Sequence, residues 1–125
     1  MTPSSPPPLH LAFIGMAGVG KSAISRRIAQ MLGVDVVDID AAVVDAAGRP
    51  IPEIFATDGE ARFRQMETDA LRAALERPDP TVIATGGGIV ESHTNRDLLA
   101  RRARVVLLHT TDAVLVERLR NSSNR

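Results

Sequence analysis

Residues 9–22 read Leu9-His-Leu-Ala-Phe-Ile-Gly15-Met-Ala-Gly18-Val-Gly20-Lys21-Ser22, an apolar run followed by a glycine-rich turn. A helical pattern starts at Lys21, so the turn has a predicted strand before it and a predicted helix after it. This is the pattern G-x-x-x-x-G-K-S, whose glycines let successive backbone N–H groups point at phosphate oxygens. The sequence therefore predicts a phosphate-binding loop for a nucleoside triphosphate.

The pattern also assigns roles within this loop. Lys21 would reach the β- and γ-phosphates, and the Ser22 hydroxyl would ligate Mg²⁺. Backbone N–H groups and the helix N-terminus would hold the other phosphate oxygens. The predicted nucleotide-binding positions are Gly15, Ala17, Gly18, Val19, Gly20, Lys21 and Ser22. A glycine-rich turn ahead of an ordinary helix is the alternative.

Working outward, four short apolar runs predict strands at residues 9–15, 34–40, 81–85 and 104–109. Apolar residues recur with helical spacing over residues 21–32, 60–77, 95–102 and 112–119. The first of these helices is expected to bury Ile24, Ile28, Met31 and Leu32 and to stop at Gly33. Strands that alternate with helices indicate an α/β fold with a parallel sheet and right-handed crossovers.

The composition limits the class of protein. With 125 residues the chain has the length of one domain, and its 15 basic and 15 acidic residues give a net charge of zero. Three phenylalanines are its only aromatic residues, so we expect no nucleic-acid partner. The chain has no cysteine, which excludes disulfides and thiol nucleophiles and fits a reducing cytoplasm.

The first eight residues differ from the rest, because four of them are prolines. No basic segment or long apolar stretch accompanies them, so neither a signal peptide nor a membrane span is expected. We expect a disordered proline-rich leader at residues 1–8, and a single domain over residues 9–125. An SH3-type proline ligand is the alternative for the leader.

Two aspartates end the second predicted strand, in Val36-Val-Asp38-Ile-Asp40. Alternate strand residues face the same side, so both carboxylates are expected on one face, where the phosphate loop opens. Such a pair could hold Mg²⁺ through water and accept hydrogen bonds from a substrate hydroxyl. The alternative is an aspartate turn that caps a following helix.

The third predicted strand runs into Gly86-Gly87-Gly88. Glycine weakens both strands and helices, so three in a row predict a loop rather than either element. Such a loop would let a ligand approach the backbone closely and would leave amide donors free. A flexible loop without a ligand is the alternative.

The longest predicted helix begins at Gly59-Glu60-Ala-Arg-Phe63-Arg64, which places Arg64 on one face with Glu60 and Glu67. A guanidinium held by carboxylates is suited to bidentate capture of a substrate carboxylate. A salt-bridged helix surface is the alternative, and the residues alone favour it.

Taken in order, these motifs resemble shikimate kinase over residues 9–125. The resemblance lies in the phosphate loop, the Asp38-Ile-Asp40 pair, residues 51–64, residues 82–88 and the strand at 105–108. It implies a three-layer P-loop sandwich, similar to nucleoside monophosphate kinases, with a parallel sheet of strand order 2-3-1-4-5. It also implies a cytoplasmic, monomeric enzyme that needs Mg²⁺ and transfers the γ-phosphoryl group of ATP to the 3-hydroxyl of shikimate, in aromatic amino-acid biosynthesis.

The resemblance implies roles for residues that match the family's motifs. Lys21, Asp40 and Arg125 would be catalytic, with Arg125 at the position of the lid arginine, and Arg118 would stack on adenine. Ser22 and Asp38 would bind the metal. The shikimate site would consist of Asp40, Phe55, Phe63, Arg64, Glu67, Gly86, Gly87 and Gly88.

The chain also differs from the family in the number of strands that its residues can form. Residues up to Arg125 supply four strands and leave none for the fifth strand and the closing helix. The domain is therefore expected to be incomplete at its C-terminus. An inactive, truncated nucleotide-binding remnant is one alternative function, and another small-metabolite kinase such as gluconate kinase is the other.

Overall fold

A computed structural model of the chain describes residues 9–15 and 20–108. The predicted leader (residues 1–8) and the predicted helix at 112–119 lie outside the described residues. So do five of the predicted site residues, which are Ala17, Gly18 and Val19 of the phosphate loop together with the two C-terminal arginines. Gly18, Arg118 and Arg125 therefore stay predictions, as do Ala17 and Val19.

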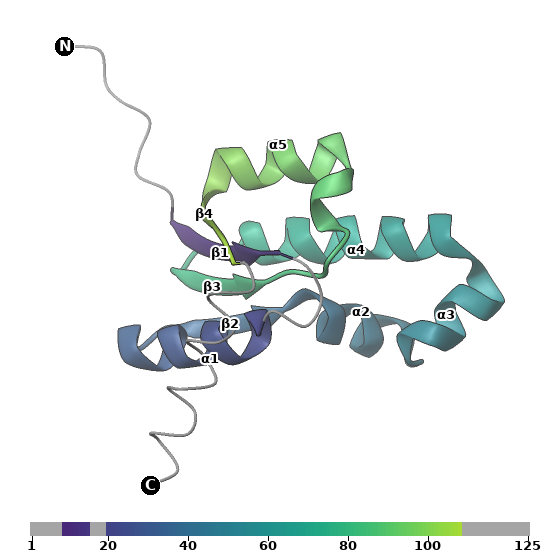
Figure 1. The fold of residues 1–125 in the computed structure, drawn as a ribbon, viewed down its shortest axis with the longest axis horizontal. Helices are drawn as coiled ribbons and strands as arrows, with labels where there is room; N and C mark the ends of the chain where they lie inside the picture. The colour runs from purple at the N-terminus through teal and green to yellow at the C-terminus, as the bar shows by residue number, and fades with distance from the viewer. Residues whose placement is uncertain (1–8, 16–19, 109–125) are drawn as a thin grey trace, which may run out of the picture.

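The described part of the fold is built on a parallel sheet. Its strands are β1 (His10–Ile14), β2 (Asp35–Asp38), β3 (Thr81–Ala84) and β4 (Ala103–Leu107), in the order β2-β3-β1-β4 (Figure 1). All pairings between neighbouring strands are parallel. The predicted α/β fold is confirmed, and these four strands follow the first four positions of the expected order 2-3-1-4-5.

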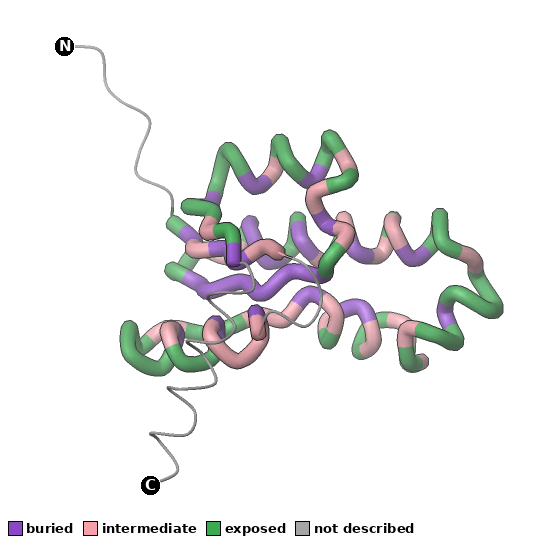
Figure 2. Tube along the Cα trace, viewed as in Figure 1, coloured by how far each residue is buried: buried purple, intermediate pink, exposed green. Residues whose placement is uncertain are grey.

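Helices cover both faces of the sheet. α1 (Lys21–Leu32) lies on one face, and α4 (Glu60–Leu75) and α5 (His93–Arg102) lie on the other (Figure 1). Successive β1 residues alternate between the two sides, since Ala12 belongs to the apolar cluster that includes α4 and α5, and Phe13 to the cluster that includes α1. Figure 2 shows β3 as a continuously buried strand, as expected for the centre of a parallel sheet.

The helices end where the local residues require it. At Gly33 the backbone takes φ 69°, a left-handed conformation that glycine adopts without strain, and its N–H bonds the carbonyls of Ala29 and Gln30. α1 therefore stops at Leu32, as predicted. α4 stops at Leu75, two residues before the predicted end. Pro78 disfavours the helical conformation at Arg77, the residue before it, so the helix ends ahead of that position.

One predicted strand was wrong at its end, and two helices were missed. The second strand ends at Asp38, and residues 39 and 40 begin a helix, because the Asp38 carboxylate accepts a hydrogen bond from the Ala41 N–H and caps it. Sequence analysis missed this helix, α2 (Ile39–Ala47), and the next one, α3 (Ile51–Asp58). Both pack against α4 through buried residues such as Val43 and Ile54.

The buried face of α1 also differs from the prediction. Met31 and Leu32 are 70% and 60% exposed, whereas Ser25 and Ala29 are buried against the sheet. Close packing of this helix on β3 favours small residues at the contact, which apolar spacing alone does not indicate.

We expect Leu71→Ala to destabilise the protein by about 2–5 kcal/mol, because this α4 side chain is fully buried and its loss leaves a cavity. Leu32→Ala is the matched control, since it removes the same atoms from a side chain that is mostly exposed. Urea unfolding of the two variants provides the measurement. Equal losses of unfolding free energy would contradict the assignment of α4 to the core.

Candidate active site

The candidate site lies at the carboxyl ends of the strands, where ligands of open α/β sheets bind. A pocket of about 370 Å³ opens there between the start of α1, the end of β2 and the residues after β3. Its lining residues are Gly20, Lys21, Ser22, Ala23, Arg26, Asp38, Asp40, Thr85, Gly86 and Gly87. It brings together three motifs that are far apart in the sequence.

Lys21 enters this pocket from the first turn of α1. Gly20 before it has φ 88°, which is easy for glycine and turns the chain from the loop into the helix. The Lys21 side chain is only 8% exposed, and its Nζ donates a hydrogen bond to the Gly15 carbonyl at the end of β1. Burial lowers the pKa of the Lys21 ammonium, while the nearby Asp40 and Asp38 carboxylates oppose this shift.

Ser22 and Asp38 meet across the pocket. The Ser22 Oγ donates a 2.7 Å hydrogen bond to Asp38 Oδ2, and Asp38 Oδ1 accepts one of 3.2 Å from Ala41 N. Asp38 therefore caps α2, as the alternative interpretation of the sequence predicted, and also binds the phosphate-loop serine. Hard oxygen donors of this kind fit Mg²⁺, which takes few protein ligands and completes its octahedron with waters and phosphates.

Within residues 9–15 and 20–108, no three His, Cys, Asp or Glu side chains lie close enough together to hold a metal ion. A site made of one hydroxyl and one carboxylate would depend on phosphate oxygens for the remaining contacts. Ser22 and Asp38 could thus supply two of the oxygen ligands that Mg²⁺ takes from a protein.

Asp40 lies in the first turn of α2 rather than at the end of a strand, which corrects the predicted geometry. It still lines the same pocket as Asp38. Burial raises the pKa of the Asp40 carboxyl, the neighbouring Asp38 raises it further, and Lys21 and Arg64 counteract both effects. A carboxylate whose pKa is raised above its ordinary value binds a proton more readily.

Arg64 and Glu67 form the ion pair that the sequence predicted on α4. The Arg64 Nη1 lies 3.2 Å from Glu67 Oε1, and Nε lies 3.7 Å from the exposed Glu60. Glu67 is 1% exposed, so its contact with Arg64 is held in a dry environment. The guanidinium also lies 5.3 Å from the centre of the Phe63 ring. One face of Arg64 is fixed, while 37% of its side chain stays accessible.

The glycines after β3 make room for these charged side chains. A Cβ atom at residue 86 would lie 2.9 Å from Asp40 Oδ1 and 3.1 Å from Glu67 Oε2. A Cβ atom at residue 88 would lie 2.5 Å from Arg64 Nη1. Gly86 and Gly88 therefore let the backbone lie against the carboxylates and the guanidinium. The sequence analysis explained these glycines only by the close approach of a ligand. Gly87 is exposed and lines the pocket.

The two predicted aromatic walls have different environments. Phe63 is 4% exposed and belongs to the main apolar cluster, while Phe55 of α3 is 38% exposed. Their ring centres are 4.8 Å apart. Phe55 is thus the ring of this pair that a bound molecule could touch most readily.

Sequence analysis missed three residues that line the pocket, namely Ala23, Arg26 and Thr85. Arg26 follows Ser22 by one helical turn, so the spacing of four residues could have placed it on the same face. Thr85 Oγ1 donates a 2.9 Å hydrogen bond to the Phe13 carbonyl, which ties the end of β3 to β1. That contact depends on strand pairing and has no sequence signal.

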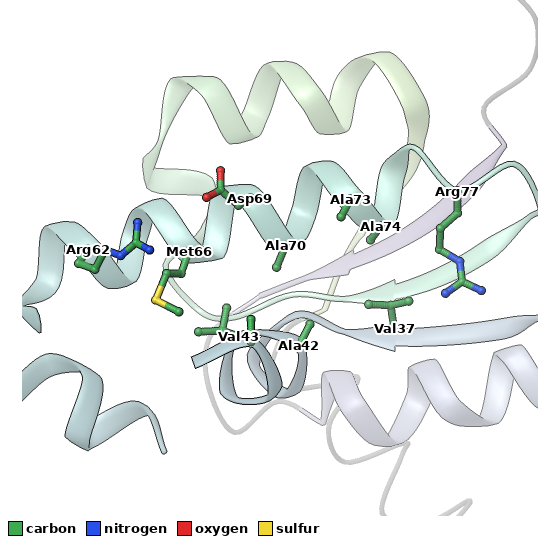
Figure 3. Close-up of a pocket in the computed structure, with 11 residues that line it drawn as sticks. Val37, Ala42, Val43, Arg62, Met66, Asp69, Ala70, Ala73, Ala74 and Arg77 are labelled. Carbon is green, nitrogen blue, oxygen red and sulfur yellow. The ribbon is translucent and has the colours of Figure 1, made fainter. Parts of the chain in front are cut away.

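A larger pocket, of about 540 Å³, lies between α2 and α4 beside the edge of β2 (Figure 3). Its walls are mainly alanines and other apolar side chains, and Arg77 at one end is paired with Asp35 at 2.6 Å. It contains neither the phosphate-loop residues nor the paired aspartates. We therefore assign the chemistry to the smaller pocket.

The parallel sheet and the pocket built on Lys21 and Ser22 define a protein of the P-loop nucleotide-binding fold. The family model "Shikimate kinase" matches residues 17–125. The chain belongs to the shikimate kinase family.

Individual relatives agree with the family match. Curated shikimate kinases of Xanthomonas euvesicatoria pv. vesicatoria (strain 85-10) and Stenotrophomonas maltophilia (strain R551-3) are each 44% identical to the chain over 119 residues, or 95% of its length. The chain spans 66% of the length of each of these relatives.

Solved structures place the fold in the same family. A shikimate kinase from Acinetobacter baumannii in complex with shikimate superposes with a TM-score of 0.79 at 34% identity, covering 94% of this chain and 65% of that one. A gluconokinase from Sinorhizobium meliloti 1021 has a TM-score of 0.59 at 22% identity, which shows a shared fold alone.

The buried Glu67 predicts a pH-dependent stability. Burial raises the pKa of its carboxyl above the ordinary value of 4.5, despite the hydrogen bond from Arg64, so the folded state binds the proton more tightly than the unfolded state. The contribution of Glu67 to the free energy of unfolding should therefore fall as the pH rises from about 4.5 through the raised pKa, by linkage.

Glu67→Gln removes this titration and keeps an oxygen that can accept from Arg64. Urea unfolding between pH 4 and pH 8 should show the variant gaining stability relative to wild type as the pH rises. A difference between the two proteins that does not change with pH would contradict the raised pKa.

Proposed function

We propose that the chain acts as a shikimate kinase, transferring the γ-phosphoryl group of ATP to the 3-hydroxyl of shikimate in aromatic amino-acid biosynthesis. The observation that carries this proposal is the pocket in which Lys21 and Ser22 lie opposite Asp40 and the backbone of Gly86 and Gly87. A phosphate-binding side thus faces a side that can hold a hydroxylated substrate. The solved relative with bound shikimate supports the choice of substrate.

On the phosphate side, Lys21 would neutralise the transferring phosphoryl group. Its Nζ rests on the Gly15 carbonyl, so the ammonium is already oriented beside the loop before a nucleotide binds. Phosphoryl transfer requires little covalent chemistry from the protein, and the positioning of charge supplies most of the acceleration. Ser22 and Asp38 would hold Mg²⁺, which neutralises phosphate charge when bound.

On the acceptor side, Asp40 would bind the shikimate hydroxyls and take the proton from the one that attacks. Its carboxylate lies beside Gly86. Its raised pKa makes it a stronger base than an ordinary aspartate, which favours uptake of the hydroxyl proton. The positive charges of Lys21 and Arg64 favour the ionised carboxylate and so oppose the rise in its pKa.

Arg64 would bind the shikimate carboxylate. Glu67 holds one Nη atom of the guanidinium, so the remaining N–H donors are presented in a fixed plane, suited to a bidentate ion pair. Gly86, Gly87 and Gly88 would offer backbone contacts to the substrate, and Phe55 with Phe63 would form its apolar walls.

The remaining assignments rest on the family resemblance. Arg118 is proposed to stack on adenine, and Arg125 to contact the transferring phosphoryl group. A monomer in the cytoplasm is also proposed. Over the residues that the structure describes, none of the helices combines the length and the apolar character that crossing a membrane needs.

The proposal predicts ADP release that depends on shikimate when the 125-residue chain is mixed with ATP and Mg²⁺. Lys21→Ala should lower this turnover by roughly a hundredfold or more, the scale for losing one charge-stabilising group, while the far-UV circular dichroism stays unchanged.

Soluble, folded protein without turnover would support the alternative of an inactive nucleotide-binding remnant. ADP release that gluconate stimulates and shikimate does not would instead favour the second alternative. Undiminished turnover by the Lys21 variant would contradict the role of this residue.

Arg64→Ala should raise the KM for shikimate by about tenfold to a hundredfold, the effect of losing a charge-assisted hydrogen bond, with little change in the KM for ATP. Steady-state kinetics with each substrate varied in turn provides the measurement. Arg62→Ala is the matched control, because Arg62 is an exposed arginine on the same helix that lines the other pocket. Equal losses for both substrates would contradict the carboxylate site.

A further inference from the structure

Asn95, at the start of α5, is 1% exposed and forms hydrogen bonds in two directions. Its Nδ2 donates a 2.9 Å hydrogen bond to the Ile89 carbonyl, and its Oδ1 accepts one of 2.8 Å from Thr68 Oγ1 on α4. The side chain thus joins α4 to the segment that follows the three glycines. A buried amide with both ends paired is costly to disturb, because any replacement leaves a partner unsatisfied.

The segment that Asn95 holds is built directly on the glycines. Residues Ile89–Glu91 form a 3-10 turn in which Ile89 N donates to the Gly86 carbonyl at 3.3 Å and Glu91 N to the Gly88 carbonyl at 3.1 Å. Arg96, the residue after Asn95, adds a 2.6 Å hydrogen bond from Nη1 to the Val90 carbonyl. The first turn of α5 therefore holds this 3-10 turn, and through it residues 86–88.

The other end of the connection is next to the Arg64 site. Thr68 follows Arg64 by four residues on α4 and so shares its helix face. Gly88 lies against the Arg64 guanidinium, and Gly86 lies against Glu67. The contacts consequently form a closed path from α4 through Thr68, Asn95 and the 3-10 turn back to α4.

Glycines have no side chains with which to hold their own loop, and they lose more conformational freedom on ordering than other residues. The position of residues 86–88 must therefore be set by contacts outside the loop. We propose that Asn95 is a positioning residue, which holds the backbone of Gly86–Gly88 at the spacing from α4 that lets Arg64 and the glycine amides bind the substrate together. This inference rests on the proposed shikimate kinase function.

The kinetic test uses Asn95→Asp, which keeps the shape of the side chain and replaces the donor to Ile89 with an oxygen, and Thr68→Val, which removes the donor to Asn95. Both should raise the KM for shikimate, by about tenfold for Asn95→Asp, the scale of one buried hydrogen bond. The KM for ATP should change little, because Lys21 and Ser22 are positioned by β1 and α1.

Thr57→Val is the matched control for Thr68→Val. It removes a hydroxyl that donates to the Glu53 carbonyl and accepts from Arg49, but on the exposed surface of α3. Its KM for shikimate should equal that of wild type. If the Asn95 and Thr68 variants lose only thermal stability while both KM values stay at wild-type levels, Asn95 is merely structural and the proposal is overturned.

Amide hydrogen exchange tests the same inference without any turnover. In Asn95→Ala, the amides of residues 87–91 should exchange roughly tenfold faster than in wild type, while the amides of β1 keep their protection. Wild-type exchange in residues 87–91 would overturn the positioning role. Absence of shikimate turnover in the wild-type chain, with the exchange result as expected, would instead overturn the proposed function and leave Asn95 as the anchor of the loop.

Discussion

The Asp38 carboxylate is the contact on which the arrangement of the site depends. One oxygen accepts the Ser22 hydroxyl at the start of α1, and the other accepts the Ala41 N–H at the start of α2. A single side chain thus fixes the phosphate loop's helix relative to the helix that carries Asp40.

The second constraint on the site is the burial of charge. Lys21 and Glu67 are almost fully buried, and Asp40 lies close to both charged centres. Burial lowers the pKa of Lys21 and raises the pKa of Asp40 and Glu67, which in each case favours the neutral form. The opposite charges nearby act against these shifts. This balance costs stability, but it holds the charged groups where water screens them less, so that their electrostatic effect on a bound ligand is stronger.

Much of the fold could be predicted from local patterns. The strand–turn–helix unit around Lys21 and the end of α1 at Gly33 follow from residue types and spacing. The first four strands also follow the expected order. The prediction failed at Asp40 and at α2, because Asp38-Ile-Asp40 has the alternation of a strand and the cap at Asp38 selects a helix. It also missed α3, which has no side-chain cap at its start. Met31 and Leu32 were assigned to the core because spacing does not report how closely a helix packs.

The sequence by itself determined which chemical groups are available: the phosphate loop, the paired aspartates, the glycine run and the arginine between two glutamates. Tertiary structure alone decided how they are used. It placed Gly88 against Arg64 and Gly86 against Asp40, and it connected α4 to the glycines through Asn95. These contacts join residues on separate elements, and their geometry depends on helix packing that no local pattern encodes.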